Sequence, residues 1–95
     1  MAIADNGDSL LLNLARAFRW QGMIDRGEFR NATELAKAVS RNQAYVSRVL
    51  RLTLLSPKIV HAIITNTLPT NVTVRTFRFG VPARWEEQHK LIGLE

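Results

Sequence analysis

A glutamine and two arginines recur at nearly helical spacing in the middle of the chain, at Gln43, Arg48 and Arg51, with Ser47 between them. A glutamine side chain can form a paired hydrogen bond with adenine, and an arginine can donate to both acceptors of guanine. These residue types therefore indicate recognition of base edges and phosphates rather than the making or breaking of covalent bonds.

The surrounding stretch, residues 34–50, has the pattern of two short amphipathic helices joined by a tight turn. Apolar residues fall on one face of each helix: Leu35, Ala36 and Val39 on the first, and Val46, Val49 and Leu50 on the second. The turn covers about 40–42, and Ser40 stands where glycine is common, because that position tends to need a left-handed backbone. Asn42 is a strong N-cap, so the second helix should begin at Gln43 and run to about residue 52. This layout is a helix-turn-helix, whose second helix enters the DNA major groove.

The side chains left on the outer face of this unit divide into two groups. The first would read base edges and comprises Gln43, Ala44, Ser47 and Arg48. The second would contact phosphate and comprises Lys37, Arg41, Asn42, Tyr45, Arg51 and Lys58. Two alternatives stay open: Gln43 and Arg48 are ordinary solvated residues, and Tyr45 packs against the protein instead of binding phosphate.

Charge is segregated along the chain. No Asp or Glu occurs from Leu35 to Trp85, a window that contains eight Lys or Arg residues, and the net charge of the whole chain is +5. Such segregation creates a field that attracts a polyanion. Charge alone is equally compatible with nucleic-acid binding and with a basic surface that binds no partner. Together with the helix-turn-helix pattern, it favours nucleic acid as the partner.

The flanking segments predict an all-α fold of about five helices. Residues 1–8 should be a flexible N-terminus and 9–95 a single domain. Asp8 or Ser9 should cap a first helix that ends near Arg26, and Asn31 should form a capping box with Glu34. Further helices are expected at 57–65, after Ser56-Pro57, at 74–78 and at 82–92. Two apolar sets should face the core: Leu10, Leu14, Ala17, Phe18 and Ile24 of the first helix, and Ile59, Val60, Ile63 and Ile64 of the fourth.

Aromatic residues exceed what a helix-turn-helix needs, and they raise the question of self-association. They are Phe18, Trp20, Phe77, Phe79 and Trp85. The surplus could form a symmetric homodimer interface, which would allow two DNA half-sites to be read. Alternatively, the C-terminal segment folds over the first helix and Trp85 completes the monomer core, which we favour slightly.

Several function classes find little support in the sequence. The 95 residues include no cysteine, and the two histidines are far apart, so no metal or cofactor is expected. No apolar run approaches ~18 residues and the N-terminus lacks a signal-peptide pattern, so we expect a cytoplasmic protein associated with the nucleoid and no membrane contact. No serine has a recognisable activating partner, so we do not expect an enzyme.

The sequence also resembles known families. The segments 33–36, 45–52 and 55–60 (Thr-Glu-Leu-Ala, Tyr-Val-Ser-Arg-Val-Leu-Arg-Leu and Leu-Ser-Pro-Lys-Ile-Val) resemble the central DNA-binding domain of the ParB and KorB partition proteins. The wider chain, about 10–92, looks still more like a region at the C-terminal end of some large serine recombinases and like related small phage or bacterial proteins. That likeness includes 14–20, 51–55 and the Pro82, Trp85, Gln88 ending. The nucleotide-binding motifs of the partition proteins are absent, so CTP use is not implied.

Two functions follow as expectations. The first is sequence-specific binding of double-stranded DNA, by a regulator or by the targeting module of a recombination system. The second is a protein-interaction module of the antiactivator type, whose basic face binds an acidic partner.

Overall fold

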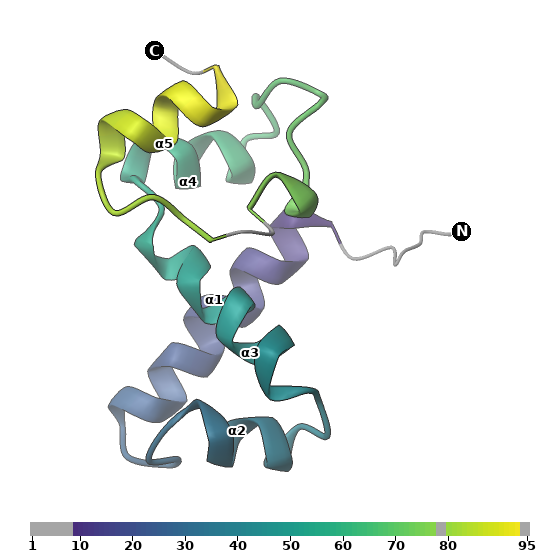
Figure 1. Cartoon of the computed structure of the whole chain (residues 1–95), viewed down its shortest axis with the longest axis vertical. Coiled ribbons are helices and arrows are strands. Elements are labelled where there is room, and N and C mark those ends of the chain that lie inside the picture. Colours follow the sequence, from purple (N-terminus) through teal and green to yellow (C-terminus); the bar gives the residue numbers. More distant parts are fainter. Residues whose placement is uncertain (1–8, 78–79, 94–95) are drawn as a thin grey trace.

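The computed structural model describes residues 9–77 and 80–93, and in these residues it contains helices and no strand. The expected all-α fold is confirmed (Figure 1). The five α-helices are α1 (Leu10–Asp25), α2 (Ala32–Ala38), α3 (Gln43–Leu50), α4 (Pro57–Ile64) and α5 (Trp85–Ile92). Two 3₁₀-helices, η1 (Arg51–Leu54) and η2 (Val74–Phe77), lie between them. The expected flexible segment 1–8 lies outside the described residues.

The long helix α1 connects the two ends of the molecule. It runs diagonally through Figure 1, with α2 beside its C-terminal end, α3 beside its middle, and α4 and α5 beyond its N-terminal part. Its N-cap is Ser9, whose hydroxyl accepts from the backbone N–H of Leu12 at 3.0 Å. Because this helix contacts α2, α3, η1 and α4, it is the frame on which the helix-turn-helix is mounted.

Three of the helices end in the same hydrogen-bonded motif. After α1, α2 and α4 the chain passes through one left-handed residue, namely Gly27 (φ 82°), Ser40 (φ 57°) and Asn66 (φ 57°). In each case the following N–H bonds back to a carbonyl of the last turn, as in the 3.0 Å bond from Arg41 to Ala36. This is the Schellman motif. Its occurrence at Ser40 confirms that the turn of the helix-turn-helix needs a left-handed residue.

The start of α2 differs in one detail from the expected capping box. Asn31 accepts from the N–H of Glu34 at 3.0 Å, as predicted. The Glu34 carboxylate, however, accepts from the N–H of Arg30 at 2.9 Å and not from that of Asn31. The carboxylate also lies 3.4 Å from the Arg30 guanidinium, and this ion pair draws it one residue further back along the chain.

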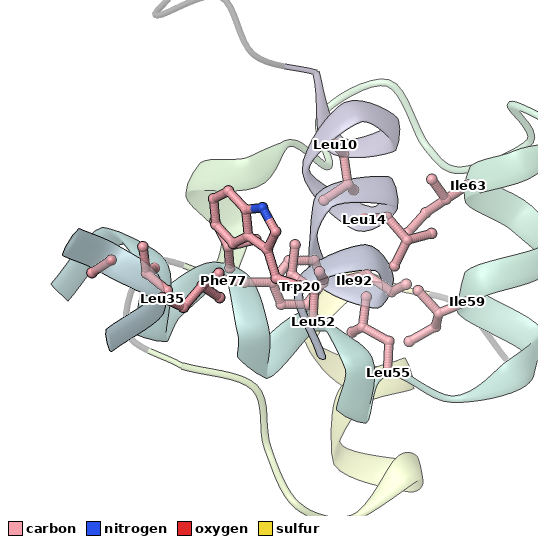
Figure 2. Close-up of a cluster of buried hydrophobic side chains, with 14 residues drawn as sticks. Leu10, Leu14, Trp20, Leu35, Leu52, Leu55, Ile59, Ile63, Phe77 and Ile92 are labelled. Atoms are coloured by element: carbon pink, nitrogen blue, oxygen red, sulfur yellow. The ribbon is translucent and has the colours of Figure 1, made fainter. Parts of the chain in front are cut away.

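One hydrophobic core joins the two ends of the molecule. Figure 2 shows Ile59 and Ile63 of α4 on one side of α1 and Leu35 of α2 on the other. Trp20 is buried in this cluster, although the sequence left its role open. Phe77 is buried as well, so η2 is held by its last residue. Phe79 is outside the described residues.

The last helix is held by a buried amide. Gln88 is fully buried, and its Oε1 accepts from the N–H of Ser56 at 2.8 Å. Its Nε2 donates to the carbonyls of Leu54, at 3.0 Å, and Pro82, at 2.7 Å. All the polar atoms of this side chain thus satisfy backbone groups, two at the η1–α4 junction and one at Pro82 just before α5, and they fix α5 against that junction.

Three expectations about the flanking helices are wrong. Phe18 (49% exposed) and Ile64 (61%) point away from the core, because the buried faces of α1 and α4 are narrower than the apolar pattern suggests. The last helix begins at Trp85 and not at Pro82, since the backbone of Arg84 is extended (ψ 133°) and Arg84 is the N-cap. Trp85 is 54% exposed and does not complete the core, because α5 is anchored by residues further along it, Gln88 and Ile92.

Candidate nucleic-acid interface

The helix-turn-helix presents one polar face and one apolar face, as the sequence predicted. Val46 and Val49 of α3 are buried against α1 and α2, whereas Gln43, Ala44 and Arg48 are exposed and Ser47 is half-buried. At about 100° per residue these four positions and Arg51 share one continuous arc of the helix surface. We call Gln43, Ala44, Ser47 and Arg48 the reading face.

The N-terminal end of α3 is shaped by Asn42. Its Oδ1 accepts from the N–H groups of Ala44, at 2.7 Å, and Tyr45, at 3.3 Å, so it acts as the predicted N-cap. The cap makes Gln43 the first residue of α3, at the exposed entrance of the helix. The helix is shorter than expected, because residues 51–54 tighten into η1 after Leu50.

Tyr45 is half-buried, and its hydroxyl is hydrogen-bonded to α1. Its hydroxyl donates to Oδ1 of the buried Asn13 and accepts from the Arg16 guanidinium, both at 3.0 Å. Its ring packs edge-on against Trp20, with the ring centroids 6.3 Å apart. Of the two alternatives for Tyr45, packing is the one that this geometry supports, and we remove it from the phosphate group. Its contacts instead fix α3 against α1.

The other residues of the phosphate group are exposed and flank the reading face. Lys37 lies on α2, and Arg41 lies in the turn, where its guanidinium stacks 5.1 Å from the centroid of the Tyr45 ring. Arg51 follows α3 and extends toward Gly80, where a Cβ would lie 3.8 Å from its Nη1. Lys58 is seven residues further on, near the start of α4. The structure therefore groups Lys37, Arg41 and Arg51 around α3, and Lys58 with α4.

Three acidic side chains form ion pairs with arginines outside the reading face. The ion pairs of the described residues include Arg26–Glu28, Arg30–Glu34 and Arg84–Glu86. Within the same residues the Arg48 and Arg51 guanidinium groups take part in no ion pair, and no protein hydrogen bond engages the Gln43 amide. A ligand would therefore displace no ion-pair partner from the described residues when it binds the two arginines.

One polar pair was not predicted from the sequence. The Ser56 hydroxyl lies 2.8 Å from Nε2 of His89, 33 residues further along the chain. The same hydroxyl caps α4 by accepting from the N–H of Ile59 at 3.2 Å. Since Ser56 is 1% exposed, a substrate could not reach its oxygen, and the pair acts as a link between α4 and α5. No local sequence signal joins these two positions.

The described part of the chain contains no cluster of three or more His, Cys, Asp or Glu side chains that could hold a metal ion. None of its helices is long and apolar enough to cross a membrane. Comparisons of the chain with protein families, with curated proteins and with solved structures give no match.

Proposed function

We propose that this protein binds double-stranded DNA in a sequence-dependent way through the major groove, with α3 as its recognition helix. The observation that carries the proposal is the reading face itself: three of its four residues are exposed, it has no acidic neighbours in sequence, and no ion pair of the described residues engages Arg48. Arg48 would donate to the two acceptors of guanine, and Gln43 would pair with adenine. Lys37, Arg41, Arg51 and Lys58 would contact the phosphate backbone on either side, and the exposed amide nitrogen of Asn42 would reach a phosphate at the helix entrance.

The biological setting is a second, less specific part of the proposal. A module of this size would serve as a regulator or as the targeting part of a recombination system, as its resemblance to partition and recombinase domains implies. Binding to chromosomal DNA would place it in the cytoplasm, on the nucleoid. Binding of an acidic protein by the same basic face is the alternative, and it needs charge but not the base-specific chemistry of Gln43 and Arg48.

Selection of duplexes from a random library would test the proposal, followed by affinity measurements on the preferred site. Arg48→Ala should cost about 1–3 kcal/mol on that site and relax the preference at one base pair. Lys90→Ala is the matched control, because it removes one exposed positive charge from α5, which lies apart from α2 and α3 (Figure 1).

Three outcomes would contradict the proposal. They are selection that enriches no sequence, equal losses for Arg48→Ala on all duplexes, and equal losses for the Arg48 and Lys90 variants. The last two would indicate binding by charge alone, and an acidic protein would then become the better candidate for the partner.

A further inference from the structure

The outer face of α1 carries an apolar stripe that no described part of the chain covers. Leu11 (50% exposed), Ala15 and Phe18 (49% exposed) lie on it, followed by the half-buried Gly22. The intervals between them are four, three and four residues, which is the spacing of a seam between two packed helices. We call these four residues the α1 stripe. Leu11 also borders a groove of about 610 Å³ that Ile64 and Val74 help to line, so the apolar surface continues past this end.

In the described part of the chain, no neighbouring helix requires a glycine at position 22. A Cβ at this position would meet only the side chain of Arg26, at 3.1 Å from Nη1, and that side chain is long and flexible. The φ of Gly22 is not in the left-handed region, so the backbone does not require glycine there. A glycine within a helix is destabilising relative to alanine. A close approach by another molecule would explain its presence.

Large and small residues alternate along the α1 stripe, and this alternation indicates that the other molecule is a second copy of the same helix. In an antiparallel pair of identical helices, the residue numbers of facing positions have a constant sum. Leu11 with Gly22 and Phe18 with Ala15 have the same sum, so a single register places both pairs opposite each other. Each large side chain would then fill the space above a small one, the arrangement that packs two helices without voids. A parallel pair would instead place Phe18 against Phe18 and Ala15 against Ala15.

The α1 stripe and the contacts with α3 lie on different faces of α1. Asn13, Arg16 and Trp20, which contact Tyr45 of α3, are on roughly the opposite side of the helix from the α1 stripe. We propose that two copies of this chain associate through the α1 stripe as an antiparallel, two-fold symmetric helix pair. The surface is small, so the dimer is weak and dissociates on dilution. This inference does not depend on the proposed DNA binding.

Sedimentation of the free protein, at concentrations up to about 0.5 mM and without DNA, tests the association. The chain should sediment as a concentration-dependent dimer. Phe18→Gln should weaken the association at least about tenfold, while the matched control Leu91→Gln, an equally exposed position on α5, leaves it unchanged. Neither variant alters the charge. A parent protein that stays monomeric throughout, or equal effects of the two variants, would overturn the proposal.

A second variant separates the interface from folding. Gly22→Leu replaces a helix glycine and should raise the melting temperature, yet it should weaken the association about tenfold or more by filling the space that Leu11 of the other copy needs. Unchanged association in this variant would show that Gly22 is not part of the interface and that the proposed antiparallel register is wrong.

Cysteine pairing tests the orientation directly, because the chain has no cysteine of its own. A mixture of Leu11→Cys and Gly22→Cys chains should form a mixed disulfide under mild oxidation. Leu11→Cys alone should not, since its two copies would lie about 16 Å apart along the antiparallel pair. Rapid crosslinking of Leu11→Cys alone, with no mixed product, would show a parallel pair and contradict the inference.

Discussion

Ser40 holds a left-handed backbone, with φ 57°, at the point where the chain turns into α3. L-residues other than glycine are strained in this region, and serine has no special tolerance for it, whereas asparagine adopts it more readily. Asn66 has the same φ in the same motif after α4. The two positions therefore form a natural comparison of one backbone conformation with two different side chains.

Ser40→Gly should stabilise the protein by about 0.5–1 kcal/mol. Glycine relieves the backbone strain, but part of this gain is lost because glycine has more conformational freedom in the unfolded chain. Asn66→Gly should gain less, about zero within error, because asparagine is already tolerated there. Urea unfolding of the two variants beside the parent would measure both. A loss of stability in Ser40→Gly would mean that the serine side chain contributes more than its backbone strain costs.

At the scale of elements, α5 depends on a single side chain more than on a broad apolar face. Gln88 satisfies three backbone groups, and Ile92 is the one apolar residue of α5 that is buried. Gln88→Ala would leave the N–H of Ser56 and the carbonyls of Leu54 and Pro82 without this partner. At about 1–3 kcal/mol for each group, partly recovered by water, the loss should be about 3 kcal/mol.

The control for that substitution is Gln21→Ala, which removes a hydrogen bond to Asp25 on the surface of α1. It should change the unfolding free energy by less than about 0.5 kcal/mol. Chemical denaturation followed by circular dichroism would compare the two glutamines. Similar small losses would mean that water replaces Gln88 at little cost and that α5 is held by Ile92 instead.

The elements that were predicted correctly are those whose ends are set by neighbouring residues. Ser9, Asn42 and Ser56 cap their helices because each needs only an N–H two or three residues away, which the sequence displays. The exposure of Trp85 and the role of Gln88 were missed, since both depend on segments about 30 residues distant. Helical periodicity was enough to predict the polar reading face of α3. The packing of Tyr45 against α1 could not be predicted in this way, because its partner Asn13 lies 32 residues earlier.

For the molecule as a whole, charge distribution governs how binding should respond to salt. Lys37, Arg41, Arg51 and Lys58 are exposed cations around α3 and the start of α4. If each contacts a phosphate, neutralising it should weaken binding by a similar factor on every duplex. It should also flatten the slope of log affinity against log salt by about 0.9, because one fewer counterion is released. Lys90→Ala should leave the slope unchanged.

Titrations at several salt concentrations, each with the preferred and an unrelated duplex, would measure those slopes. A residue whose neutralisation leaves the slope unaltered lies outside the footprint. If Lys58 alone behaves in this way, the contact surface ends with η1. If it does not, the N-terminal part of α4 also approaches the DNA backbone.

The bond from the Ser56 amide to Gln88 also has a consequence for hydrogen exchange. Amides at the beginning of a helix usually exchange quickly, because no earlier carbonyl protects them. The Ser56 amide is buried and bonded at 2.8 Å, so it should exchange orders of magnitude more slowly than the amide of Asn31, an exposed cap residue. Its exchange rate would report how often α5 detaches while the other helices stay folded. In Gln88→Ala that protection should be lost first at Ser56 and not at Val46, which the core of α1, α2 and α3 still covers.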